Sequence, residues 1–119
     1  MKKDEVVERF GLTTKQLNQL DKYIIELIEF NKHTNLVGKS TLSNIWERHI
    51  ADCLQLSLFI PKKNLKIFDI GTGGGLPGIP LSIVGYQNIY MIDSVGKKID
   101  FIKSVISLLS LSAKAEKKR

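Results

Sequence analysis

Side chains that commonly hold metals or form disulfides are scarce in this sequence. The 119 residues include one cysteine, Cys53, and two histidines. A single cysteine excludes an intramolecular disulfide and a thiolate metal cluster, and two histidines beside it argue against a structural zinc site. No Ser/His/Asp or Cys/His grouping typical of nucleophilic catalysis stands out. The sequence therefore predicts no metal site and leaves the catalytic residues unassigned.

Long apolar runs are also absent. No window approaches the roughly 18 uninterrupted apolar residues that a membrane-spanning helix needs. Residues 1–5 are charged, and no apolar signal core follows them. A lone cysteine is compatible with a reducing compartment. We therefore expect a cytoplasmic protein with no membrane partner.

Positive charge exceeds negative charge, with 18 lysines and arginines against 12 aspartates and glutamates and a net charge of +6. Such an excess is compatible with a polyanionic partner. Half of it lies in the last seven residues, where four cations accompany Glu116. We interpret residues 113–119 as a basic tail in solvent, so the charge by itself is weak evidence for contact with nucleic acid.

Residues 1–60 have the periodicity of helices. Thr13 and Gln16 have the spacing of a capping box, in which each side chain bonds to a backbone N–H at a helix start. Before it, residues 6–10 predict a short helix that ends at Gly11. A third helix is expected from about Ser40 or Thr41. The apolar residues that repeat at helical spacing are Leu17, Leu20, Ile24, Leu27 and Ile28 in the second helix, and Leu42, Ile45, Trp46, Ile50, Cys53 and Leu54 in the third. Residues 1–60 are thus predicted to form a helical segment.

From Leu65 the pattern changes to alternating strands and helices. It predicts a strand over 65–70, a glycine-rich turn over 71–76, a helix over about 77–84, a strand over 89–93 and a helix over about 97–111. A βαβα order indicates an α/β fold with a parallel strand pair and a right-handed crossover. Two strands alone would leave an open sheet edge, through which the chain could self-associate. We interpret residues 61–112 as the first half of a cofactor-binding domain.

The most informative stretch follows the first predicted strand. Residues 69–78 read Asp-Ile-Gly-Thr-Gly-Gly-Gly-Leu-Pro-Gly, a D-x-G-x-G-x-G pattern. Glycines lack the Cβ atoms that would keep a ligand away from the backbone. Asp93 ends the second predicted strand 22 positions after Gly71, near the spacing of about 20 at which an acid binds ribose hydroxyls. Together these features predict a site for a cofactor that contains a nucleoside.

Two cofactors are compatible with this turn, and the sequence favours one of them. Gly73, Gly75 and Gly78 match the dinucleotide pattern G-x-G-x-x-G, which would suit a nicotinamide cofactor. That frame begins two residues late, however, and two prolines near the helix start lack the N–H groups that would bind a pyrophosphate. S-adenosylmethionine has no phosphate and is therefore favoured. Asp69 would either order the turn or face the positive charge of this cofactor.

Arg48 and His49 lie on the third predicted helix and have two interpretations. His49 lies beside the apolar stripe, which favours a partly buried, hydrogen-bonded histidine. Arg48 and Asp52 have the i, i+4 spacing of a surface ion pair. Alternatively, Arg48 contacts phosphate on a substrate. His33 and Asn35 would either pin the helical segment or touch substrate, and the sequence does not decide between these roles.

Four motifs, taken in order, resemble one protein family. They are Asn31-Lys32-x-x-Asn35-Leu36, Arg48-His49-Ile50-x-Asp52, the stretch over residues 69–81, and Asp93-Ser94-x-Gly96-Lys97-Lys98. The extension of the glycine turn through Leu-Pro-Gly-Ile-Pro is the most specific of them. From about residue 20 to about residue 110, the chain resembles the N-terminal part of the bacterial ribosomal RNA small subunit methyltransferase G family, also known as glucose-inhibited division protein B.

The resemblance implies an enzyme that transfers a methyl group from S-adenosylmethionine to N7 of a guanine in 16S rRNA, with the small ribosomal subunit as partner. It also implies a Rossmann-like sheet preceded by helices. Guanine N7 carries a free lone pair, so transfer needs no general base and would rest on positioning.

The resemblance further assigns site residues. Gly71, Gly73, Gly75 and Leu76 would line the methionine and ribose part of the cofactor, and Asp93 would bind the ribose hydroxyls. Arg48 and His49 match positions near the substrate.

Length is the main departure from the family. The family continues with further strands, an acidic region near the adenine and a later arginine, and this sequence has no counterpart of them. The fold is therefore expected to be a truncated one. The alternative to an active methyltransferase is a non-catalytic remnant of the family, and the weaker alternative is a module that binds a nicotinamide dinucleotide.

Overall fold

A computed structural model describes all 119 residues. The helical part comprises α1 (Lys3–Arg9), α2 (Thr14–Asn31), the 3-10 helix η1 (Lys39–Asn44), the π-helical turn η2 (Trp46–Ile50), α3 (Ala51–Gln55) and the 3-10 turn η3 (Leu56–Leu58). It is followed by β1 (Lys66–Ile70), α4 (Gly78–Ile83), β2 (Asn88–Asp93), α5 (Gly96–Leu109) and β3 (Lys114–Lys117). The predicted α/β class, with helices ahead of a parallel sheet, is confirmed.

The start of α2 is set locally, as the sequence predicts. The Thr13 hydroxyl accepts a hydrogen bond from the Gln16 N–H at 3.1 Å, and the Gln16 side chain accepts one from the Thr13 N–H at 2.9 Å. This capping box satisfies two N–H groups that a helix start leaves without partners. Gly11, at φ +58°, lets the chain turn between α1 and α2.

The third predicted helix is present but irregular. Instead of one α-helix from about Ser40, the chain forms η1, η2, α3 and η3 in succession. Arg48 and Asp52 form no ion pair, which corrects the prediction from their spacing. The physical reason is that a π-helical turn changes the angle between successive residues, so i, i+4 neighbours no longer lie above one another.

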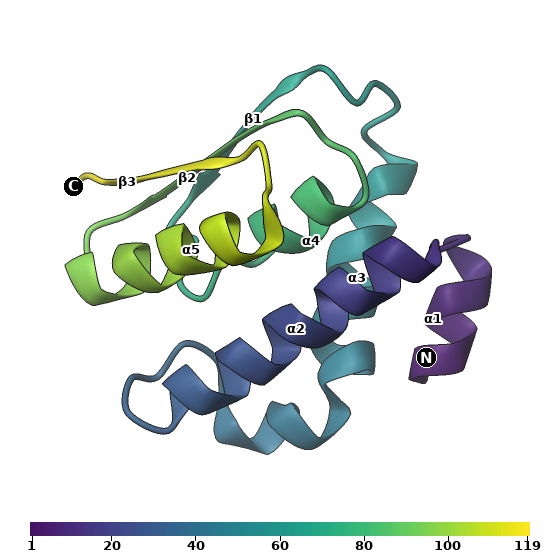
Figure 1. Cartoon of the computed structure of the whole chain (residues 1–119), viewed down its shortest axis with the longest axis horizontal. Helices are drawn as coiled ribbons and strands as arrows, with labels where there is room; N and C mark the ends of the chain where they lie inside the picture. Colours follow the sequence, from purple (N-terminus) through teal and green to yellow (C-terminus); the bar gives the residue numbers. More distant parts are fainter.

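The sheet has the order β1-β2-β3, and both strand pairs are parallel. Right-handed crossovers that always step in the same direction place their helices on the same face. Accordingly, Figure 1 shows α4 and α5 on one side of the sheet, with the N-terminal helices beyond them on that same side. The two helices pack on Ile89 and Met91 of the central strand, which are buried.

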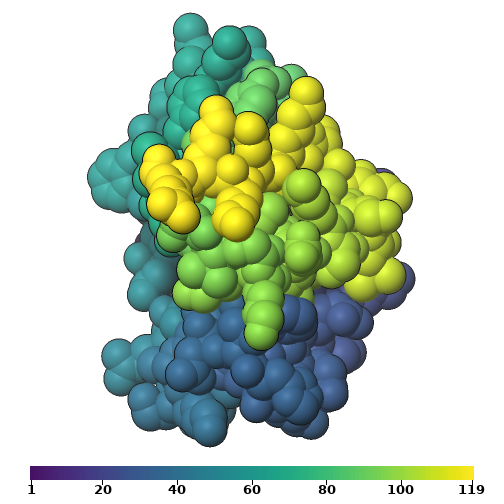
Figure 2. Space-filling view, turned by 90° about the vertical axis from the view of Figure 1, so that its left-hand side faces the viewer, coloured from purple at the N-terminus to yellow at the C-terminus, as the bar shows by residue number.

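The third strand corrects the prediction of two strands and of a solvated basic tail. Lys114–Lys117 pairs with β2, with Lys114 opposite Tyr90 and Lys117 opposite Asp93. Ala113, which leads into the strand, is 5% exposed. Figure 2 shows these C-terminal residues, in yellow, packed on the surface of the molecule instead of projecting from it. The lysine side chains remain in solvent while the backbone joins the sheet, because an edge strand tolerates charged side chains.

The opposite face of the sheet carries no helix. We call it the open sheet face and define it by Phe68, Ile70, Tyr90 and Ile92, which alternate with buried residues along β1 and β2. Phe68 is 59% exposed and Ile70 is 79% exposed. The Phe68 and Tyr90 rings stack on this face with centroids 5.2 Å apart. The sheet is thus covered by helices on one face only.

None of the helices has the length and apolar character to cross a bilayer.

Candidate cofactor site

The glycine turn lies at the carboxyl end of β1 and leads into α4. Gly71, Gly73 and Gly75 have φ of +73°, +58° and +93°, a region that side chains other than glycine rarely adopt. The buried Asp69 carboxylate closes the turn, since its Oδ2 accepts hydrogen bonds from the Thr72 hydroxyl at 2.6 Å and from the Gly78 N–H at 3.0 Å. Of its two predicted roles, Asp69 has the first one, that of ordering the turn.

Electrostatics at Asp69 reflect its burial. Loss of solvent raises the pKa of the Asp69 carboxyl, and the nearby Asp93 charge acts in the same direction. The two hydrogen bonds from Thr72 and Gly78 oppose this shift without cancelling it. Gly78 is required beside this carboxylate, because a Cβ there would lie 3.0 Å from Asp69 Oδ2 and 2.5 Å from Met91 Sδ.

Asp93 and the glycine turn meet, as their spacing in the sequence predicts. Asp93 Oδ2 accepts a hydrogen bond from the Gly73 N–H at 3.0 Å, and Oδ1 accepts one from the Val95 N–H at 2.9 Å. Burial alone would raise the pKa of Asp93, but these bonds outweigh it and Lys98 adds to them, so the pKa lies below its usual value. Each oxygen accepts one bond from the protein and retains capacity for a second.

The backbone N–H groups of the turn are largely used within the protein. Those of Gly71 and Thr72 donate to the Ile92 carbonyl at 2.8 and 3.2 Å, and those of Gly75 and Leu76 donate to the Thr72 carbonyl at 3.0 and 3.2 Å. With Gly73 bonded to Asp93, the N–H of Gly74 alone has no acceptor between residues 71 and 76. A pyrophosphate would find one free donor here, whereas dinucleotide sites offer several. The turn favours a ligand that approaches closely but carries no phosphate.

The N-terminal helices hold the back of the turn. The buried Tyr23 hydroxyl of α2 donates to the Gly74 carbonyl at 2.7 Å. A Cβ on Gly74 would lie 2.9 Å from Leu27 Cδ1 and 3.0 Å from Leu36 Cβ, so glycine allows this close packing. Sequence reasoning did not single out Tyr23, although its spacing of three from Leu20 and four from Leu27 was the available signal.

The loop over residues 32–38 is pinned by Asn31. Its Oδ1 accepts hydrogen bonds from the N–H groups of Leu36 at 2.7 Å and Val37 at 2.9 Å, and the residue is 2% exposed. This arrangement sets Leu36 against Gly74. His33 and Asn35, to which the sequence analysis gave a pinning or substrate role, are exposed and make no side-chain hydrogen bond. The pinning residue is therefore Asn31.

Arg48 and His49 lie in η2, and no hydrogen bond or ion pair connects them to the turn. Arg48 is exposed. The His49 Nε2 atom lies 2.7 Å from the Thr41 hydroxyl, which also donates to the Gly38 carbonyl at 2.7 Å. Burial lowers the pKa of His49, and Asp52 partly opposes the shift. This is the partly buried, hydrogen-bonded histidine of the first interpretation.

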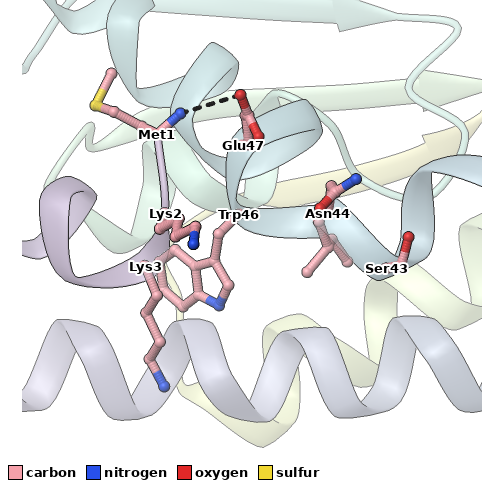
Figure 3. A pocket seen from close by; sticks show the side chains of 8 residues that line it. Met1, Lys2, Lys3, Ser43, Asn44, Trp46 and Glu47 are labelled. Atoms are coloured by element: carbon pink, nitrogen blue, oxygen red, sulfur yellow. Dashed lines mark ion pairs between the residues drawn. The ribbon is translucent and has the colours of Figure 1, made fainter.

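A separate hollow of about 280 Å³ lies where the N-terminus meets η2. Figure 3 shows Trp46 among the residues that line it, with an ion pair between the Met1 amino group and Glu47. This pair is 3.4 Å long, and the Lys3 ammonium lies 5.5 Å from the centroid of the indole. None of the predicted cofactor residues lines it. The hollow lies between the start of the chain and residues 43–47, and it is distinct from the glycine turn.

Comparisons with known proteins identify the family of this chain. A sequence model of the family described as rRNA small subunit methyltransferase G matches residues 16–119. The chain is similar to proteins named "Ribosomal RNA small subunit methyltransferase G" from Rhodospirillum centenum (36% identity over 92% of this chain and 51% of that protein), Orientia tsutsugamushi strain Ikeda (36% over 83% and 50%) and Magnetococcus marinus (42% over 78% and 42%).

The similarity has a defined extent. The chain corresponds to the N-terminal region of these relatives and spans about half of their length. The match nevertheless includes the glycine turn, Asp93 and all three strands, since it covers residues 16–119. The chain belongs to the rRNA small subunit methyltransferase G family.

Proposed function

We propose that the glycine turn and Asp93 bind S-adenosylmethionine and form the cofactor half of an enzyme that methylates N7 of a guanine in 16S rRNA. The observation that carries this proposal is the Gly73–Asp93 hydrogen bond, which sets an acid at the end of β2 beside a turn with little capacity for phosphate. Membership of a methyltransferase family supports a methyl donor as the cofactor.

Each residue of the site has a role in this proposal. When bound, S-adenosylmethionine supplies a methyl group on a positively charged sulfur. Gly71 and Gly73 leave room for the cofactor near the backbone. Gly75 lines it with backbone, since the space of its missing Cβ is taken by Ile79, and Leu76 borders it two residues before α4. Asp93 uses its remaining lone pairs to accept hydrogen bonds from ribose hydroxyls. A site at the ends of parallel strands, where the chain turns into a helix, is the usual ligand position in such sheets.

Arg48 and His49 form the proposed substrate side of the site. Arg48 is exposed and is available to a phosphate of the rRNA. His49 holds the segment around Arg48 through Thr41, so we assign it a positioning role near the substrate. Guanine N7 attacks with its own lone pair, and no proton has to be removed before the methyl group is transferred. The reaction therefore needs no general acid or general base. The contribution of the protein is to orient the cofactor and the guanine relative to each other.

Cofactor binding is tested by isothermal titration calorimetry with S-adenosylmethionine. The Asp93→Asn variant is expected to bind at least about tenfold more weakly, since it loses charge-assisted bonds to ribose. Asp100→Asn is the matched control, because Asp100 is an exposed carboxylate on α5. Equal affinity of Asp93→Asn and the unchanged protein contradicts the assignment of Asp93. Saturable binding of NAD without binding of S-adenosylmethionine supports the nicotinamide alternative instead.

Activity is tested separately, by transfer of a labelled methyl group to 16S rRNA and to 30S subunits. We expect the 119-residue chain to bind the cofactor without transferring the group, because its relatives have about twice the length. The full-length Magnetococcus marinus relative serves as the positive control. Transfer by these 119 residues would show that this half is sufficient, whereas binding without transfer would show that it supplies the cofactor site alone.

A further inference from the structure

The loop that follows α2 brings a backbone carbonyl to the glycine turn. The Leu36 oxygen lies 3.7 Å from the position that a Cβ on Gly73 would take. Apart from the residues next to Gly73 in the chain, it is the only heavy atom within 4 Å of that position. No such atom lies within 4 Å of the corresponding position on Gly71. The space over these two glycines is therefore open apart from one carbonyl oxygen.

Asn31 sets the direction of this carbonyl. The Val37 N–H, which donates to Asn31 Oδ1 at 2.9 Å, belongs to the same peptide group as the Leu36 carbonyl. That peptide is trans, and in a trans peptide the N–H and the C=O point in opposite directions. The hydrogen bond to Asn31 therefore turns the Leu36 carbonyl away from Asn31. Asn31 is 2% exposed, so this bond is shielded from solvent.

The Leu36 carbonyl has no hydrogen-bond donor within the protein. Leu36 is half-buried and lies outside the helices and strands, so no backbone ladder occupies this oxygen. Hydrogen bonds in a chain polarise one another, and the bond from Val37 to Asn31 makes the same peptide group a better acceptor. An unpaired acceptor thus borders the open space of the turn.

The amino-acid part of S-adenosylmethionine carries an ammonium group, which donates hydrogen bonds and accepts none. The two acids of the turn already have other partners. Asp69 is buried, and its Oδ2 accepts bonds from Thr72 and Gly78. Asp93 is assigned to the ribose. Among the groups around the turn, the Leu36 carbonyl is the acceptor that is left for a cation.

We propose that the Leu36 carbonyl accepts a hydrogen bond from the ammonium group of S-adenosylmethionine, and that Asn31 is the positioning residue that directs this carbonyl. The inference rests on the proposed function, because it concerns the same cofactor. It makes the loop after α2 a direct part of the cofactor site, in addition to the packing of Leu36 on Gly74.

The test observes this one peptide group. Leu36-Val37 is the only leucine followed by valine in the sequence. Protein labelled with ¹³C in the leucine carbonyl and ¹⁵N in valine therefore gives a single signal in an HNCO spectrum. The probes are S-adenosylmethionine, decarboxylated S-adenosylmethionine, which keeps the amino group and lacks the carboxylate, and methylthioadenosine, which lacks the whole amino-acid part.

We expect the Leu36 carbonyl carbon to shift downfield with the first two probes and to stay in place with methylthioadenosine, because a hydrogen bond to the oxygen deshields the carbon. A downfield shift with all three probes assigns the carbonyl to the nucleoside and overturns the inference. No shift while calorimetry shows S-adenosylmethionine bound overturns it too and leaves the proposed function intact. Absence of S-adenosylmethionine binding contradicts the proposed function, and the inference fails with it.

The positioning role of Asn31 has its own measurement. In calorimetry, Asn31→Ala is expected to bind S-adenosylmethionine and its decarboxylated form about tenfold more weakly, the size of a lost hydrogen bond to a charged group. Its affinity for methylthioadenosine should stay the same. Asn35→Ala is the matched control, because Asn35 is exposed on the same loop and should leave all three affinities unchanged. An equal loss for all three probes in Asn31→Ala would indicate a merely structural role and overturn the assignment.

Discussion

The Tyr23 hydroxyl donates a hydrogen bond of 2.7 Å to the carbonyl of Gly74, 51 residues away in the sequence. This bond connects α2 to the centre of the glycine turn and is buried. The N-terminal helices are therefore part of the framework of the candidate cofactor site. The desolvated environment raises the pKa of Tyr23 well above its ordinary value, so the phenol stays protonated and remains a donor.

Replacement of Tyr23 by phenylalanine tests this connection. Tyr23→Phe leaves the Gly74 carbonyl without its donor, and a buried acceptor without a partner costs about 1–3 kcal/mol in the free energy of unfolding. The turn also loses a restraint, so binding of S-adenosylmethionine should weaken. Urea denaturation and calorimetry measure the two effects.

The control for this substitution is Tyr86→Phe, because the Tyr86 hydroxyl donates to the Ile60 carbonyl, outside the turn. It should lower stability without changing cofactor affinity. If both variants lower affinity equally, the connection between Tyr23 and the site is wrong.

Gly78→Ala tests the close packing behind the turn. The new Cβ would meet Met91 Sδ at 2.5 Å and Asp69 Oδ2 at 3.0 Å. Overpacking of this kind costs about 1–3 kcal/mol in the free energy of unfolding. Gly38→Ala is the matched control, since Gly38 has an ordinary φ of −64° and the nearest atom to its Cβ would be 3.9 Å away. Equal stabilities of the two variants in urea denaturation would refute the packing argument.

Asn31→Ala tests how the loop over residues 32–38 is held. Loss of the Asn31 side-chain oxygen, Oδ1, removes the acceptor for the Leu36 and Val37 N–H groups. Their amide hydrogen exchange should accelerate by about tenfold or more, because local opening becomes easier. The exposed Asn35 provides the control variant Asn35→Ala, for which exchange should stay the same. Unchanged exchange in Asn31→Ala would show that other contacts hold the loop.

His49 makes stability depend on pH. Burial lowers its pKa in the folded state, so the unfolded chain binds the proton more readily. The contribution of His49 to stability is present above the unfolded pKa of about 6.5 and is lost as the pH falls through the lower folded value. Urea denaturation between pH 7.5 and pH 5, a window of about one unit or more on either side of that pKa, should show this loss.

The variant His49→Gln should show a flatter pH profile, because the group that takes up the proton is gone. His33→Gln, which alters the exposed histidine, is the control and should keep the profile of the unchanged protein. A steep profile that persists in His49→Gln would mean that another group is responsible.

Much of the local structure follows from residues near one another in the sequence. The Thr13–Gln16 capping box starts α2, and the change from helical spacing to alternating strands and helices after residue 60 marks the α/β part. Asp93 meets Gly73 because parallel strands joined by a right-handed crossover bring their carboxyl ends together. Each of these features depends on short-range chemistry or on a general rule of chain geometry.

Other features were decided by tertiary structure alone. Lysine-rich residues 114–117 form a strand because β2 offers an unpaired edge, and composition does not reveal that edge. Packing between segments also decides three other features. They are the π-helical turn around Arg48, the hydrogen bonds by which Asn31 rather than His33 or Asn35 holds the loop, and the bond from Tyr23 to Gly74. Sequence patterns identify which residues can cap a helix, line a turn or bury a side chain. Packing between segments far apart in the chain determines which residues those side chains contact. The reason is that most buried polar groups are hydrogen-bonded, and the fold decides which donors and acceptors lie near them.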